Sequence, residues 1–284
     1  MTHAAYTLFS PVVRSTCVVF ASPHSGRAYP ADFLAQSRLD HLAIRSSEDA
    51  WIDDLFADAP RHGAPLLAAR TPRAYIDFNR APEELDPALI DGVRRLSPNP
   101  RVASGLGVIP RVVAGGRVIR DGKITLDQAH DRITRHWRPW HDCLQRLLDE
   151  SGRLFGRSIL IDCHSMPHEA LDTIAGPRPD EVIGDRFGAS ASAAIVAGVE
   201  AALTDAGLRV ARNAPFAGAY VTQHYGKPAR RQHALQIEID RALYMNEATL
   251  EKRPDFDDLR HLLDGVVARI AAIGADDDRA VAAE

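Results

Sequence analysis

Short apolar runs alternate with longer amphipathic segments along this chain. Runs of four to six residues rich in Val, Ile, Leu or Ala are typical of buried strands. The predicted strands are residues 16–21, 65–69, 74–78, 158–163, 208–211 and 234–239. Apolar residues at helical spacing predict helices at residues 51–59, 125–148, 184–206 and 254–273. This alternation predicts an α/β fold, a three-layer α/β/α domain around a mixed, mostly parallel sheet.

Two stretches depart from this alternation. Residues 79–123 are rich in Pro, Gly and Arg, and so long a loop in a compact domain is usually functional, often at a pocket rim. Residues 275–284 form an acidic, Ala-rich tail that we expect to be mobile. The chain has 284 residues, and α/β folds of this size often form one domain, so we expect a single domain over residues 1–274.

Composition excludes several classes of protein. With 45% hydrophobic residues, 25% charged residues and a net charge of −4, the chain has no bias toward nucleic acid. No apolar stretch reaches the length of a membrane span, and the N-terminus does not resemble a signal peptide, so we expect a cytoplasmic protein without a membrane partner. Its three cysteines form no C-x-x-C pair. A metal ion would therefore be held by His and carboxylate side chains.

Two predicted strands end in the same dipeptide. His24-Ser25 follows residues 16–21, and His164-Ser165 follows residues 158–163. Strand ends are where α/β folds hold ligands and metals, so the two histidines indicate one assembled site. A catalytic zinc ion takes three protein ligands and leaves one position for water.

Two candidates remain open for the carboxylate ligand of this zinc site. Glu48 and Asp49 lie at the start of the helix predicted for residues 51–59. An acidic pair after serine is also what a helix N-terminus favours, and each histidine could equally be a structural residue of the core.

A third candidate for chemistry is Glu238. In residues 234–239, Gln236 and Glu238 fall on one face and the aliphatic side chains on the other, a pattern that also fits an ordinary half-exposed strand. If helices cover both faces, we expect Glu238 to be semi-buried with a raised pKa. It would then suit a general base that activates water. Asp240 would lie either behind the groups that contact metal and substrate or at the rim of the site.

Candidate substrate ligands lie in two loops. Asn79 and Arg80 offer a fork of donors that matches a carboxylate, and Arg73 is a second candidate. The glycine-rich stretch 216–226 contains side chains that can donate hydrogen bonds at a pocket wall, although its glycines equally fit tight turns. These side chains are Thr222, His224 and Tyr225.

Nucleophilic catalysis has little support in the sequence. Cys163 and His164 are neighbours on a predicted strand, so their side chains point to opposite faces and cannot easily pair as nucleophile and base. No G-x-S-x-G motif is present for a nucleophilic serine. Metal-assisted hydrolysis is therefore favoured.

Several of these motifs also occur together in a known family. They are Ser22-Pro23-His24-Ser25-Gly26, Tyr75-Ile76-Asp77-Phe78-Asn79-Arg80, Asp162-Cys163-His164-Ser165, and the stretch 218–226 followed by His233-Ala234-Leu235-Gln236-Ile237-Glu238. In order and spacing the chain resembles the N-formylglutamate amidohydrolase family from about Ser22 to Glu247. The resemblance implies a fold similar to zinc carboxypeptidases and hydrolysis of N-formyl-L-glutamate to formate and L-glutamate, at the end of a histidine-degradation route.

The resemblance also implies roles for single residues. His24 and His164 match the metal histidines, with the acidic ligand at Asp49 or Glu48, and Glu238 matches the general base. Asn79-Arg80 resembles the pair that holds the substrate's α-carboxylate. The sequence has Ser47-Glu48-Asp49 where the family's Asp-Thr-Asp is expected, and residues 105–123 differ from the family's usual loop.

We therefore predict a hydrolase with one Zn²⁺ per chain, although another divalent metal would suit the same ligands. Its partner would be a small carboxylated N-acyl amino acid. Two alternatives stay open: a hydrolase of another N-acyl or N-formimino amino acid, and a metal-free, non-catalytic protein that binds carboxylated amino acids.

Overall fold

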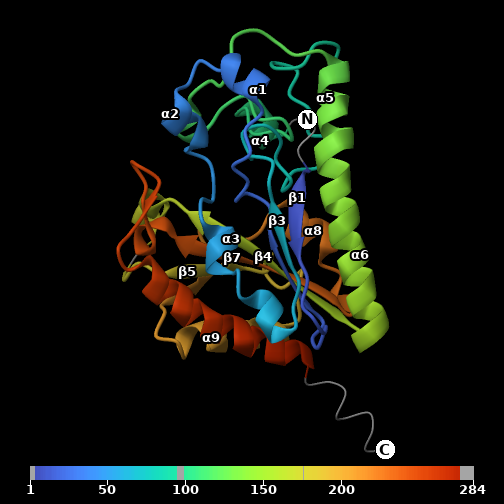
Figure 1. Ribbon diagram of the computed structural model, residues 1–284, viewed down its shortest axis with the longest axis vertical. Coiled ribbons are helices and arrows are strands. Elements are labelled where there is room, and N and C mark those ends of the chain that lie inside the picture. Colours follow the sequence, from blue (N-terminus) through green and yellow to red (C-terminus); the bar gives the residue numbers. More distant parts are fainter. Residues whose placement is uncertain (1–3, 95–98, 175, 276–284) are drawn as a thin grey trace, which may run out of the picture. The chain divides into compact units, whose positions relative to one another are not determined.

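A seven-stranded sheet organises the computed structural model, which describes residues 4–94, 99–174 and 176–275 (Figure 1). The strand order in this described part is β1-β3-β2-β4-β7-β5-β6. The strands are β1 Tyr6–Phe9, β2 Val18–Ser22, β3 Leu66–Ala69, β4 Ser158–Met166, β5 Glu181–Gly184, β6 Val210–Arg212 and β7 Gln232–Asp240. A separate two-stranded ladder joins β8 Met245–Asn246 to β9 Glu251–Lys252.

Parallel pairing dominates the large sheet. β2 pairs in parallel with both β3 and β4, β4 pairs in parallel with β7, and β5 pairs in parallel with β6. β5 runs antiparallel to β7. The prediction of an α/β fold with a mixed, mostly parallel sheet is confirmed. The carboxyl ends of β2, β4 and β7 lie at one edge of the sheet, because these strands run in the same direction.

Most helices are short. The α-helices are α1 Ala31–Ala35, α2 His41–Arg45, α3 Ile52–Leu55, α4 Pro100–Ala103, α5 Leu126–Arg132, α6 Arg138–Phe155, α7 Ala193–Thr204, α8 Tyr220–Tyr225 and α9 Phe256–Ala275. A π-helical segment, η3 Ile133–Trp137, joins α5 to α6. Short 3-10 helices are η1 Ala59–His62, η2 Ala114–Gly116, η4 His168–Thr173, η5 Pro228–Arg230 and η6 Arg241–Leu243. Among the helices that the structure describes, none is long and apolar enough to cross a membrane.

The chain divides into two compact units. Unit 1 contains residues 1–7, 23–50 and 69–143, and unit 2 contains residues 8–22, 51–68 and 144–284. The expectation of one domain over residues 1–274 is not tested by this division and stays a prediction. The acidic tail expected at residues 275–284 lies outside the described residues from residue 276 onward.

In unit 2, helical segments lie on both faces of the sheet. α9 packs against α3, α7 and η1, and a Cβ at its Gly274 would meet the Val18 side chain. A Cβ at Gly184 would instead meet the backbone of Ala217 and Gly218, just before α8. Val18 is the ladder partner of Ile159, so these two side chains point to the same face of the sheet as α9. Gly184 is the partner of Gln236, which is itself the partner of Asp162, and these residues point to the opposite face. The sheet is therefore covered on both sides in this unit.

Unit 1 is dominated by loops around a small apolar cluster. Its buried members are Phe33, Ile44, Ala74, Val113 and Ile119. Tyr75 packs against this cluster, and its ring meets Phe33 edge to face at 5.2 Å. This packing anchors the segment that follows Tyr75, which carries several candidate site residues.

Three predictions of local structure were wrong. Residues 74–78 form turns rather than a strand, because Tyr75 and Ile76 donate to Pro72 O and Asp77 donates to Val108 O. The helix expected at residues 184–206 begins only at Ala193, after strand β5. The helix expected at residues 51–59 is interrupted: Trp51 has a left-handed backbone with φ 67°, and α3 ends at Leu55.

Candidate functional site

Three buried side chains offer ligand atoms to a common point. His24 follows β2, His164 lies on β4, and Asp49 lies in the loop before α3. One ligand atom from each of them lies within 4.8 Å of the others. A backbone hydrogen bond from Asp49 N to His24 O, 3.1 Å long, holds the loop beside the histidine. These are three of the four residues that the sequence analysis proposed for zinc.

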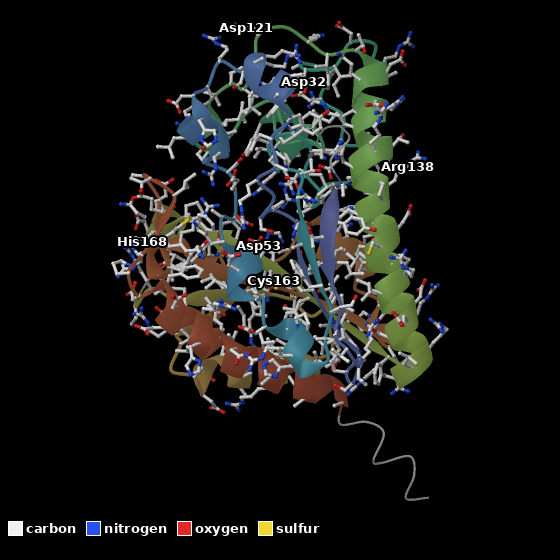
Figure 2. The ribbon with its side chains drawn as sticks, viewed as in Figure 1. Asp32, Asp53, Asp121, Arg138, Cys163 and His168 are labelled. Atoms are coloured by element: carbon white, nitrogen blue, oxygen red, sulfur yellow. The ribbon has the colours of Figure 1, made fainter. Side chains whose placement is uncertain are left out.

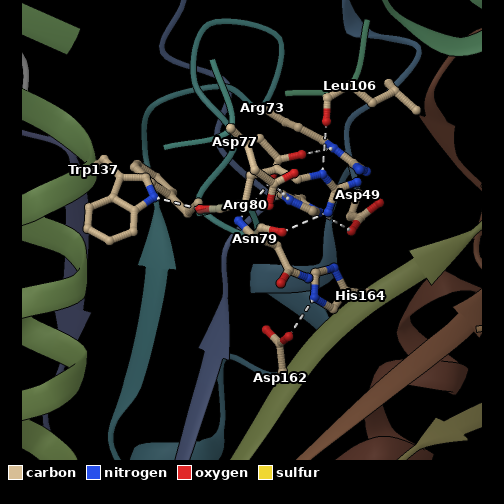
Figure 3. Close-up of polar contacts among 12 residues, drawn as sticks. Asp49, Arg73, Asp77, Asn79, Arg80, Leu106, Trp137, Asp162 and His164 are labelled. Atoms are coloured by element: carbon tan, nitrogen blue, oxygen red, sulfur yellow. Dashed lines mark hydrogen bonds and ion pairs between the residues drawn. The ribbon is translucent and has the colours of Figure 1, made fainter. Parts of the chain in front are cut away.

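Each histidine also has a carboxylate beside it. His24 Nε2 donates to Asp77 Oδ1 at 2.8 Å. His164 Nε2 lies 2.9 Å from Asp162 Oδ2 (Figure 3). Because a carboxylate accepts, Nε2 of His24 carries the proton, and Nδ1 of this ring is left as the ligand atom. Carboxylate–histidine pairs of this kind fix the tautomer of metal ligands.

The group therefore fits a zinc ion. His24 Nδ1 lies 3.3 Å from Asp49 Oδ2. Ligand atoms about 2.1 Å from a tetrahedral zinc ion are about 3.4 Å apart. Two neutral imidazoles and one carboxylate are also a ligand set that catalytic zinc sites use.

Glu48, the other carboxylate proposed as a ligand, has different neighbours. Its oxygens accept hydrogen bonds from Arg45 at 3.1 to 3.2 Å, and it lies outside the His24–Asp49–His164 group. Burial raises the pKa of Glu48, and the Arg45 guanidinium opposes this shift. We therefore carry Asp49 forward as the candidate ligand.

Glu238 lies beside His164 in the sheet. The two residues are direct partners in the β4–β7 ladder, so their side chains share one face on strands about 4.8 Å apart. Glu238 is 7% exposed, and Gln236 Nε2 donates to its Oε1 at 2.6 Å. The expected semi-buried position is thus observed, while the role of general base stays a proposal. Gln236 orients this carboxylate, a function that the sequence analysis did not assign.

Asp77 connects several candidate residues of unit 1. Besides His24, it accepts from Arg73 Nε at 3.0 Å and from the backbone N–H of Asn79 at 2.7 Å. Burial alone would raise the pKa of Asp77, but the facing charges of Arg73 and Arg80 and the hydrogen bond from His24 hold it well below its usual range. Asp77 therefore stays ionised while buried.

Arg80 is a buried cation in the same segment. It is 6% exposed, and its guanidinium donates to Leu106 O at 3.0 Å and to Asn79 O at 2.7 Å. Burial lowers the pKa of Arg80, and Asp77 opposes this effect. Arg73, Asn79 and Arg80 are thus brought together around Asp77 (Figure 3). The structure does not test their predicted contact with substrate.

The candidates from the glycine-rich stretch lie on α8 in unit 2. Thr222 is fully buried and donates to Ala219 O at 3.0 Å, and Tyr225 is 1% exposed. His224 is exposed, and its ring stacks on Tyr220 at 5.1 Å. These contacts show structural roles for Thr222 and His224. Their predicted place in a pocket wall stays a proposal.

Two other polar groups of unit 2 lie apart from this chemistry. Asp240 accepts from the ring of His168, which is labelled in Figure 2, at 2.7 Å and caps η6 through the Ala242 N–H. Cys163 is fully buried, and burial raises the pKa of its thiol well above the ordinary value. A thiol of this kind is a poor nucleophile, in agreement with the sequence analysis.

Sequence reasoning missed the contacts of Asp77, Asp162 and Gln236 with the site. A signal existed for Asp162, because residues two apart on a strand share a face and Asp162 precedes His164 by two. The same spacing links Gln236 to Glu238. Asp77 gave no such signal, since its contact with His24 joins residues 53 positions apart.

Fold and site together define an α/β protein with a buried His–Asp–His group that could hold a metal ion, and comparison with known proteins gives the family. The model of N-formylglutamate amidohydrolases matches residues 16–245, so the chain belongs to this family. The predictions of the family and of an enzyme that hydrolyses an amide C–N bond are confirmed at this level.

Individual relatives agree with the family match. The N-formylglutamate deformylase of Pseudomonas putida is 27% identical over 81% of this chain and 82% of its own. That of Pseudomonas aeruginosa is 28% identical over 88% and 92%. The crystal structure of N-formylglutamate amidohydrolase from Ralstonia eutropha JMP134 has a TM-score of 0.90 at 37% identity and covers 96% of this chain and 99% of that chain.

Proposed function

We propose that the protein hydrolyses N-formyl-L-glutamate to formate and L-glutamate with the help of a bound zinc ion. The relatives named above support the substrate. The observation that carries the proposal is the buried His24–Asp49–His164 group, because its residue types and spacing suit a catalytic zinc ion.

Each nearby side chain has a role in this reaction. The two histidines and Asp49 would hold a zinc ion, which would supply Lewis acidity toward the formyl carbonyl and water. Glu238 takes a proton from the attacking water and returns it to the leaving amine, so that formate and the free amino group of glutamate result. Arg80 and Asn79 bind the substrate's α-carboxylate, with Arg73 beside them. Thr222 to Tyr225 line the pocket.

The proposal also covers the cellular context. The reaction would take place in the cytoplasm and complete a route of histidine degradation. Its partner is the small carboxylated substrate, and no nucleic acid or membrane takes part. A fold related to zinc carboxypeptidases is part of the same proposal.

The test is release of L-glutamate from N-formyl-L-glutamate by the purified protein, before and after chelation and again after zinc is restored. Activity that chelation abolishes and zinc restores is the expected result. A zinc-loaded sample without glutamate release would contradict the substrate and favour other N-acyl amino acids. A protein that binds no metal would favour the carboxylate-binding alternative.

A matched pair of variants tests the ligand set in the same assay. Asp49→Asn should lose zinc, whereas Glu48→Gln should retain it, because Glu48 contacts Arg45. Zinc content measured after gel filtration separates the two outcomes. Zinc lost from the Glu48 variant and kept in the Asp49 variant would reverse the assignment.

A further inference from the structure

The segment Tyr75–Arg80 holds its shape without a β-ladder. It carries Asp77, Asn79 and Arg80, yet its residues form turns rather than a strand. Most of it is buried, and buried backbone carbonyls need hydrogen-bond donors. In this segment the donors come largely from side chains.

One continuous helical run, formed by α5, η3 and α6, supplies three of these donors within unit 1. Arg132 Nη1 donates to Tyr75 O at 3.1 Å, and His141 Nε2 donates to Phe78 O at 2.9 Å. Trp137 Nε1 donates to Arg80 O at 3.0 Å (Figure 3). Three backbone carbonyls of the segment are therefore held by three side chains of neighbouring helical turns.

Ring contacts reinforce this attachment. The Arg132 guanidinium lies 3.9 Å from the centre of the Tyr75 ring, and the Trp140 ring stacks on Phe78 at 5.2 Å, nearly parallel. Trp137 and His141 are themselves in contact, with ring centres 3.8 Å apart. The donors thus have little freedom to leave their carbonyl partners.

The π-helical segment explains how these donors come to share a face. In an α-helix, residues three or four apart align, so Arg132 and Trp137, five apart, would diverge. A π-helix bonds residue i to i+5 and brings residues five apart together. Trp137 and His141 are four apart and align across the start of α6. The π-helical segment η3 therefore places Arg132, Trp137 and His141 on the same side of the helical run, facing the carbonyls of residues 75–80.

We propose that Arg132, Trp137 and His141 are positioning residues for catalysis: they hold Asn79 and Arg80 in the orientation that binds the substrate's carboxylate. This inference rests on the function proposed above for Asn79 and Arg80. The three residues do not touch the reacting atoms. They act through the backbone of the segment, whose carbonyls flank the candidate substrate ligands.

Two tryptophans provide a matched comparison. Trp137→Phe removes an indole N–H that donates to Arg80 O. Trp140→Phe removes an indole N–H that has no hydrogen-bond partner among the described residues, and it keeps an aromatic ring to pack against Phe78. Loss of a buried hydrogen bond next to Arg80 should raise KM for N-formyl-L-glutamate roughly tenfold in the zinc-loaded enzyme, because displaced binding groups are costly. KM of Trp140→Phe should stay within about twofold of the original value.

The balance between KM and kcat separates positioning from general damage. Asn79 and Arg80 bind the carboxylate equally in the ground state and the transition state, so kcat of Trp137→Phe should change little. His141→Leu should raise KM in the same way, and His141→Gln, which retains an N–H donor, should recover most of the loss. Equal KM values in Trp137→Phe and Trp140→Phe would overturn the proposal.

Hydrogen exchange tests the same inference without substrate. Trp137→Phe should accelerate amide exchange in peptides that contain residues 75–80 and leave β4 and β7 unchanged, and Trp140→Phe should not have this effect. Unchanged exchange of residues 75–80 in Trp137→Phe would contradict the positioning role. If the original protein does not hydrolyse N-formyl-L-glutamate, the proposed function fails, while this exchange result still decides whether the segment is held.

Discussion

At the scale of single residues, the carboxylates behind the two histidines do more than pair with them. Asp77 accepts from Nε2 of His24, which leaves Nδ1 of that ring for a metal, and Asp162 lies beside Nε2 of His164. A neutral imidazole in the correct tautomer is a requirement for metal binding. Asp77 also accepts from the backbone N–H of Asn79, so it links the candidate metal ligand His24 to the segment that carries Asn79.

Glu238 provides the sharpest test at this scale. Glu238→Gln keeps the size of the side chain but removes the base, so kcat should fall by about 10² or more while zinc and substrate binding persist. Steady-state kinetics together with zinc analysis measure this effect. The matched control is Asp240→Asn on the same face of β7, whose carboxylate contacts His168 and should not affect kcat. Undiminished turnover in the Glu238 variant would remove this residue from the mechanism.

The sequence predicted which residue types form the candidate site, but it predicted only in part which individual residue has which role. His24, His164 and Glu238 stand at strand ends or on a strand, where a local pattern predicts their surroundings. The choice between Asp49 and Glu48 could not be made in this way, because the two are adjacent in one loop. The Arg45 side chain, which pairs with Glu48, distinguishes them in the structure.

At the scale of elements, the turn after β2 shows how tightly one loop is fitted. A Cβ at Gly26 would lie 2.1 Å from Thr71 O and 2.6 Å from the Thr71 carbonyl carbon. Ala28 N also donates to Arg70 O at 2.9 Å, which fixes the two segments together. Glycine is therefore required at position 26 for close approach of backbones, two residues after His24.

Gly26→Ala should consequently displace this turn. We expect a loss of about 1–3 kcal/mol in the free energy of unfolding, because the added methyl group overlaps backbone atoms. Weakened zinc binding should accompany it, since the turn carries His24. Gly152→Ala is the control, as an added Cβ there meets nothing within 4 Å on the exposed face of α6. Equal thermal stability of the two variants would show that the turn adapts at no cost.

Elements with a regular apolar pattern could be predicted from the sequence, and irregular ones could not. β4 and β7 appear near their expected positions because buried parallel strands need continuous apolar runs. Residues 74–78 have a similar composition but form turns. Their backbone partners lie at Pro72 and Val108 and on the α5–α6 helices, and local composition does not encode such partners.

At the scale of the whole molecule, the protein buries a carboxyl group that has no role in the proposed reaction. Glu181 on β5 is fully buried, and neither of its oxygens has a hydrogen-bond partner within the described ranges. Burial, assisted by the nearby Asp180, raises the pKa of Glu181 from an ordinary value of 4.5 to about 8. The folded protein therefore keeps this proton at neutral pH.

This shift predicts a pH-dependent stability. Between pH 4.5 and about 8 the unfolded chain releases the Glu181 proton and the folded chain retains it, so stability falls as pH rises. The contribution is at most about 1.4 kcal/mol per pH unit. Glu181→Gln should remove it, and urea unfolding of both proteins across this range measures the slopes. Identical slopes would show that Glu181 is ionised in the folded state.

The sequence by itself determined the α/β class, the strands that carry His164 and Glu238, and the residue types of a candidate metal site. It could do so because periodic apolar patterns and strand-end positions are local properties of the chain. Only the tertiary structure decided which carboxylate joins His24 and His164, and that Asp77 supports one of these histidines. It also decided that a π-helical segment holds residues 75–80. These outcomes depend on contacts between residues far apart in sequence, whose geometry exists only after the chain has folded.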